Sequence, residues 1–217
     1  MRPLISFLIP TLRERTTKFN SLCDKLFLQI EEHNLQKKVE VLSICDNRDL
    51  QLSVKRNTLQ KMSSGLYFLH MDDDDRVADD YCKTVCDEIM KLKDKVQTLE
   101  ELPDIIGYNQ LCEVDDKVFI VKTNPASSMG LTPCGNQYDE SMNHNGNIPV
   151  YQRVPWQYHL WSRDKFARVY RSDADTNAKE DQNWLKRAYL EYPQSYHNID
   201  KILHYYYFKN DGTSTCQ

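Results

Sequence analysis

The chain has 217 residues, a net charge of −4, 40% hydrophobic residues and 28% charged residues, which is the composition of a soluble globular domain. The acidic balance argues against a nucleic-acid partner, which would need a basic face, and no apolar run approaches the ~18 residues of a transmembrane segment. The seven cysteines are scattered and the apolar start is too short for a signal peptide, so we expect reduced thiols and a cytoplasmic protein.

Strands and helices alternate through the first 95 residues. Such alternation predicts right-handed crossovers and a parallel sheet, in which ligands bind at the carboxyl ends of the strands. The segments that begin at Thr11, Asp46 and Asp72 each follow a strand, so they should share one edge of the sheet. The expected strands are 4–10, 39–45 and 66–71, and the expected helices are 20–33, 53–62 (with Ser53 as N-cap) and 78–96.

The second half of the chain is less regular. Two apolar runs joined at 115–116 predict a hairpin, and the stretch 124–155 has no clear periodicity. The further expected elements are strands at 104–114, 117–123 and 201–208 and a helix at 178–192.

Four consecutive aspartates, Asp72 to Asp75, stand at the end of an apolar strand. Like charges this close repel one another unless something positive lies among them. A hard divalent cation takes oxygen ligands and often shares its shell with substrate phosphates, so the run predicts a metal site. The alternative is a solvated acidic turn at the start of the next helix, which would explain one or two of the aspartates.

This segment, with Val77 two residues after the aspartates, resembles the Asp-x-Asp segment of family 2 glycosyltransferases with the GT-A fold. The stretches FLIPTLRER, LSICDN and SVKRN resemble further family segments in the same order. The resemblance implies an α/β GT-A fold with a Rossmann-like, mostly parallel central sheet flanked by helices and an irregular acceptor-side C-terminal half. It implies one domain over 1–217, with a nucleotide-sugar-binding half at 1–100 and an acceptor-binding half at 101–217.

The resemblance also assigns roles to side chains of the first half. Lys55 is instead expected on an exposed basic helix face, and Asp46 has the alternative of capping its own turn. Asp74 would hold Mn²⁺ or Mg²⁺ at the diphosphate. The nucleotide-sugar-binding residues would be Thr11 and Arg13 in the nucleotide pocket, Asp46 at the base, Arg56 facing the nucleotide, Asp72 at the ribose, and Asp73 beside it.

A second carboxylate pair, Glu180 and Asp181, is expected at a helix start, where the family places its catalytic residues. A sugar hydroxyl must lose its proton as it attacks, so a general base is required. The pattern Asn177-x-x-Glu180 fits a capping box that would employ the glutamate. Asp181 is therefore the expected base.

Histidines and tryptophans of the second half are candidates for the metal and the acceptor. His204 lies where some GT-A enzymes have a late metal ligand, although a histidine in an aromatic strand is more often part of the core. Trp156 and His159 fall in a segment comparable to one that lines the acceptor pocket in the family, with core packing as the alternative.

Taken together, the resemblance implies a metal-dependent inverting glycosyltransferase that uses a nucleotide-diphosphate sugar donor, UDP favoured, and a glycan or other hydroxyl acceptor. A magnesium-dependent phosphatase of the haloacid-dehalogenase type is an alternative, because Asp73-x-Asp75 superficially fits its nucleophile loop. A non-catalytic module that binds a nucleotide sugar is another. The six glycines form neither a dinucleotide-binding nor a P-loop motif.

Overall fold

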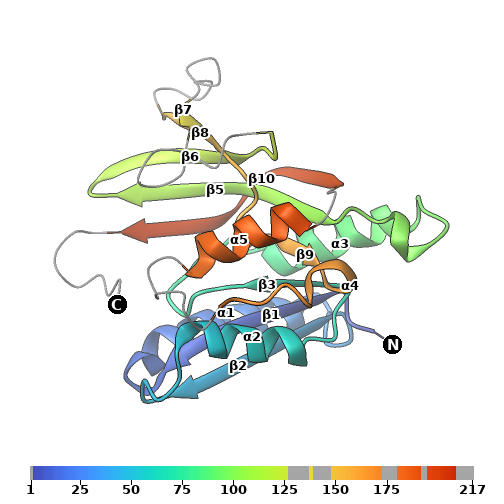
Figure 1. Ribbon diagram of the computed structural model, residues 1–217. Coiled ribbons are helices and arrows are strands. Elements are labelled where there is room, and N and C mark those ends of the chain that lie inside the picture. Colours follow the sequence, from blue (N-terminus) through green and yellow to red (C-terminus); the bar gives the residue numbers. More distant parts are fainter. Residues whose placement is uncertain (1, 127–136, 139–147, 173–179, 192–194, 209–217) are drawn as a thin grey trace.

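The computed structural model describes residues 2–126, 137–138, 148–172, 180–191 and 195–208 (Figure 1). The helices are α1 (Thr16–Glu32), α2 (Leu52–Met62), α3 (Tyr81–Lys93), α4 (Arg163–Phe166) and α5 (Glu180–Glu191), with short 3-10 turns η1 (Arg13–Arg15) and η2 (Leu99–Glu101). The strands are β1 (Ile5–Leu12), β2 (Val39–Asp46), β3 (Tyr67–His70), β4 (Arg76–Val77), β5 (Ile105–Val114), β6 (Lys117–Thr123), β7 (Gln137–Tyr138), β8 (Val150–Arg153), β9 (Leu160–Ser162) and β10 (Tyr196–Phe208).

The described strands form one mixed sheet in the order β2-β1-β3-β9-β5-β6-β8-β7, with β10 paired to β5 and β4. Its longest ladders, β1–β2 and β5–β10, are parallel, as the α/β prediction required. Strand β9 runs antiparallel to both β3 and β5, so β1, β2, β3, β5 and β10 all run in one direction. Their carboxyl ends lie at one edge of the sheet, which we term the carboxyl edge (Figure 1).

Helices cover both faces of the sheet. Phe7 and Ile9 of β1 pack into a core with α1 and α3, whereas Leu8 packs into a second core with α2, α4 and α5. This division follows from the strand alternation, which sends successive side chains to opposite faces. We refer to the two sides as the α1/α3 face and the α5 face.

Several local expectations change in the structure. Helix α2 begins at Leu52 with Gln51 as its N-cap residue, so the prediction that Ser53 caps it was wrong. Strand β9, which follows His159, was not expected, because three residues are too few to show a period. The predicted hairpin turn is confirmed: Asp115 and Asp116 have φ values of 48° and 64°, as a tight turn between β5 and β6 requires.

Strand β10 starts five residues earlier than its sequence pattern suggests. The register with β5 shifts between Ile199 and Ile202 and again before His204. Such irregularities break the alternation of burial from which a strand is recognised. None of the described helices has the length and apolarity needed to cross a membrane.

Candidate functional site

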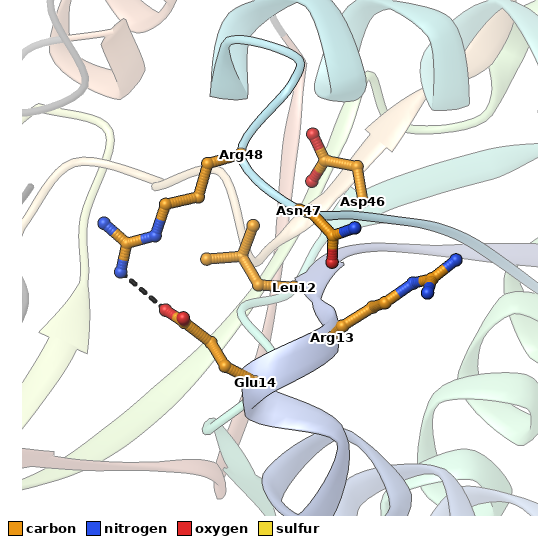
Figure 2. Close-up of a pocket in the computed structure, with 6 residues that line it drawn as sticks. All are labelled: Leu12, Arg13, Glu14, Asp46, Asn47 and Arg48. Atoms are coloured by element: carbon orange, nitrogen blue, oxygen red, sulfur yellow. Dashed lines mark hydrogen bonds and ion pairs between the residues drawn. The ribbon is translucent and has the colours of Figure 1, made fainter.

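A pocket of about 380 Å³ opens at the carboxyl edge, between the ends of β1 and β2 (Figure 2). An ion pair of 2.5 Å between Arg48 and Glu14 spans one side of it. The structure thus brings the predicted nucleotide residues Arg13 and Asp46 to one cavity. Its lining is Leu12, Arg13, Glu14, Asp46, Asn47 and Arg48.

Asp46 is held from two directions. Its Oδ2 accepts a hydrogen bond from the amide of Leu50, and its Oδ1 accepts one of 2.7 Å from Lys55 Nζ, which also donates to the carbonyl of Thr11. Burial alone would raise the pKa of Asp46, but the Lys55 ammonium and the Leu50 amide hold it below the usual value. Lys55 is 4% exposed, so its expected place on an exposed helix face was wrong. It lies against the carboxyl end of β1, where it offsets the charge of Asp46.

Two of the four consecutive aspartates are largely shielded from solvent, because the side chains of Asp73 and Asp75 are 3% and 12% exposed. Asp73, 3% exposed, accepts hydrogen bonds from Thr11 Oγ1 at 2.7 Å and from Arg15 Nε at 2.7 and 2.9 Å. Asp75 has its Oδ1 3.3 Å from Nε2 of His204. Side chains of the protein therefore contact both carboxylates. Thr11, which was expected in the nucleotide pocket, binds Asp73 of the aspartate loop.

The other two aspartates reach the surface. The Asp72 and Asp74 side chains are 49% and 44% exposed. Arg56 donates to Asp72, while Arg15 Nη2 and Lys18 Nζ lie 2.8 and 3.4 Å from Asp74 Oδ2. Every aspartate of the run thus faces an arginine, lysine or histidine, so side chains of the protein itself offset their mutual repulsion.

Asp72 and Asp74 are suited to bind a divalent cation whose remaining ligands come from a bound substrate. Within the described residues, no group of three or more His, Cys, Asp and Glu side chains is arranged to hold a metal. Mg²⁺ is commonly held by one or two carboxylates together with substrate phosphates, and the exposed Asp72 and Asp74 offer that donor set. His204 is 1% exposed, stacks on Tyr158 at 4.5 Å and has its Nε2 3.3 Å from Asp75 Oδ1, so it lies in the core beneath the loop.

Glu180, 1% exposed, lies at the centre of a buried polar network. Arg56 and Arg171 both donate to its carboxylate, and both also donate to Gln157 Oε1, at 2.7 and 3.0 Å. Arg171 Nη1 lies 3.2 Å from His70 Nε2. Because Arg56 also binds Asp72, the network links the start of α5 to the aspartate loop.

Sequence reasoning did not identify Arg15, Arg171 or Gln157. The unmatched negative charge of the aspartate run signalled that cations should lie nearby, but not which ones. Arg171 lies outside regular secondary structure, where no periodicity marks a buried position. Burial, with a further contribution from the two arginines of the network, holds the pKa of His70 well below its usual value.

Asp181 follows Glu180 but has a different environment. Its side chain is partly exposed, and its Oδ1 accepts a hydrogen bond of 2.7 Å from the amide of Gln182. Asn177, the other member of the expected capping box, lies outside the described residues. The Glu180 carboxylate forms ion pairs with two arginines. Asp181 is therefore the solvent-accessible acid of the pair.

On the acceptor side, His159 is 1% exposed and supports the segment that precedes β9. Its Nδ1 accepts a hydrogen bond from the amide of Trp156, and its Nε2 lies 3.0 Å from Thr123 Oγ1. Burial lowers the pKa of His159 to about 3. Trp156 is partly exposed with the guanidinium of Arg153 3.7 Å from its ring centre. The geometry makes His159 a support for Trp156.

The protein resembles known proteins in its structure but not detectably in its sequence. No protein-family model and no curated protein matches the sequence. Among solved structures, S. aureus TarS 1–349 superposes with a TM-score of 0.53 and 16% identity over 94% of this chain and 60% of that one. The same TarS fragment has been solved with UDP-GlcNAc, with a TM-score of 0.53, 16% identity and coverage of 94% and 58%, and with UDP, with a TM-score of 0.52, 16% identity and coverage of 94% and 60%. The chain therefore shares the fold of TarS and spans about 60% of that fragment's length.

Proposed function

We propose that this protein is a metal-dependent inverting glycosyltransferase that uses a nucleotide-diphosphate sugar, UDP favoured. The observation that carries the proposal is convergence at the carboxyl edge of a TarS-like fold. A pocket at β1 and β2, the aspartate loop after β3 and the start of α5 all meet there. Ligands of open α/β sheets bind outside the carboxyl ends of the strands.

The β1/β2 pocket is the proposed nucleotide site. Asp46 is fixed by Lys55 and ionised by its surroundings, so it can accept a hydrogen bond from an N–H group of a base. Arg13 is exposed at the same pocket and can meet a phosphate. The TarS complex with UDP supports uridine as the nucleoside. The diphosphate would then extend toward Asp72 and Asp74.

Mn²⁺ or Mg²⁺ is the proposed cofactor, held by Asp74 with the donor diphosphate. When bound, such an ion neutralises the negative charge that develops on the leaving diphosphate. Arg15 and Lys18 contact Asp74 from the protein side, so they position the carboxylate.

Asp181 is the proposed general base. It would take the proton of the acceptor hydroxyl as the oxygen attacks the anomeric carbon from the face opposite the leaving diphosphate, which inverts that carbon. Glu180, bound by Arg56 and Arg171, would fix the start of α5 and thereby position Asp181.

Thermal unfolding with UDP, GDP, dTDP, CDP and ADP, each with and without Mn²⁺, tests the donor site. A ligand present at 100 times its dissociation constant should stabilise the protein by about 2.7 kcal/mol. We expect a Mn²⁺-dependent shift with UDP that is lost in Asp74→Asn. No shift with any nucleotide would contradict the proposal. Binding without transfer or hydrolysis of UDP-sugars would indicate a non-catalytic module, and a phospho-aspartate intermediate would indicate a phosphatase.

A further inference from the structure

Three tyrosines in a row stand exposed near the end of β10. Tyr205, Tyr206 and Tyr207 are 36%, 41% and 48% exposed. Single exposed apolar side chains are common on protein surfaces, but a contiguous group of large ones often marks a binding surface. Because β10 runs parallel to β5, these residues lie toward the carboxyl edge of the sheet (Figure 1).

The pairing of β10 with β5 shows which way the rings point. Tyr205 is paired with Leu111 and Tyr207 with Glu113, so each shares a face with its partner. Both β5 residues have the same parity as Ile105, which packs in the core of the α5 face. Tyr205 and Tyr207 therefore project on the side of the sheet where α5 lies, the helix whose first turn contains Asp181.

The same two tyrosines adjoin the aspartate loop. Tyr205 is paired with Arg76, the residue that directly follows Asp75 in the chain. The guanidinium of Arg76 lies 6.0 Å from the ring centre of Tyr207. The two tyrosines thus lie beside the residue that follows the aspartate run.

We propose that Tyr205 and Tyr207 form a platform that binds a pyranose ring of a saccharide acceptor. This inference rests on the proposed function and adds the chemical class of the acceptor. The electron-rich face of an aromatic ring attracts the positive edges of C–H groups, and one face of a pyranose presents such groups. Arg76 and Glu113 flank the rings and can hydrogen-bond the sugar hydroxyls.

Position favours a saccharide over other occupants. The acceptor hydroxyl must reach the carboxyl edge on the side of Asp181, and the tyrosines lie on that side. Tyrosine combines an apolar ring with a polar hydroxyl, which suits a surface that is wetted between substrates. The arginine and glutamate at its border suit a ligand that bears hydroxyl groups more than an apolar protein surface.

The experiment is saturation-transfer NMR on the full chain with chitotetraose, cellotetraose and maltotetraose as probes. We expect at least one to bind the wild type, and the Tyr205→Ala/Tyr207→Ala double variant to bind it at least tenfold more weakly. Tyr206→Ala is the matched control, because Tyr206 is equally exposed on the same strand but points to the other face. It should bind as the wild type does.

Two further variants separate the ring from the fold. Tyr205→Phe/Tyr207→Phe should keep most of the affinity, because the ring faces remain. Tyr205→Leu/Tyr207→Leu keeps apolar strand residues but removes the rings, so it should lose binding even if the alanine variant does not fold.

Other results would overturn the platform. Absence of binding to all three probes, or equal loss in Tyr206→Ala, contradicts it. Concentration-dependent self-association abolished by the double variant, without saccharide binding, would identify the surface as a protein interface. The UDP shift with Mn²⁺ is measured separately on each variant. Its absence in the wild type would contradict the donor assignment, whereas saccharide binding would still report on the tyrosines.

Discussion

The aspartate loop and the first turn of α5 each place two neighbouring carboxylates in opposite surroundings. Asp73 and Glu180 are buried and held by arginines, whereas Asp74 and Asp181 reach the solvent. A buried charge is costly unless it is paired, so the buried member of each pair has a structural role through its ion pair. The exposed member of each pair is the one that a ligand can reach.

Asp181, the exposed carboxylate at the start of α5, gives the prediction with the largest effect. Asp181→Asn removes the proposed base, and general-base catalysis is worth about 10² to 10⁴ in rate, so turnover of a UDP-sugar should fall by that factor. Unfolding free energy should change by less than about 0.5 kcal/mol, because the side chain is partly exposed. Steady-state kinetics with parallel urea unfolding measures both quantities. Unchanged turnover would remove Asp181 from the mechanism.

Glu180→Gln tests the buried half of the same pair. Removal of the negative charge leaves Arg56 and Arg171 without their shared partner, and breaking a buried ion pair typically costs about 3–5 kcal/mol. Urea unfolding of the variant should show this loss, with Asp181→Asn as the matched control one residue away. A loss below about 1 kcal/mol would mean that the network does not depend on Glu180.

The aspartate loop offers the corresponding test one residue apart. Asp73→Asn weakens the hydrogen bonds with Thr11 and Arg15 inside the protein, and we expect a loss of about 1–3 kcal/mol in unfolding free energy. Asp74→Asn should cost less than about 0.5 kcal/mol but abolish the Mn²⁺-dependent part of the UDP shift. Thermal unfolding with and without UDP and Mn²⁺ separates the two. Equal stability losses in the two variants would contradict the assignment of a structural role to Asp73 and a ligand-binding role to Asp74.

Much of the fold could be predicted from the hydrophobic periodicity of short segments. Alternating strands and helices placed Asp46 and Asp72 at one edge, because parallel strands end together. The helix period at 178–192 likewise predicted α5, in which Trp184, Leu185 and Ala188 are fully buried. These features depend on residues close together in the sequence, so periodicity reveals them.

The partners of the carboxylates could not be predicted in this way. Arg15 meets Asp73 across 58 positions, and Arg56 meets Gln157 across 101. Periodicity indicates the face on which a side chain lies, but not which side chain of another element it meets. Lys55 shows the consequence: a lysine on a helix is usually exposed, and the nearby Asp46 reverses that expectation.

The last prediction concerns acid stability and the burial of His159. Its pKa is about 3 in the folded protein against an ordinary value of 6.5, because the ring is buried. Between these values the unfolded chain binds the proton more readily, so unfolding free energy falls as pH is lowered below 6.5. A single such group contributes at most about 1.4 kcal/mol per pH unit. Urea unfolding from pH 7 to 4.5 should give a shallower slope for His159→Gln than for the wild type by about this amount, with His70 supplying part of the slope that remains. Parallel slopes would show that folding does not lower the pKa of His159, and would contradict its role as a buried support for Trp156.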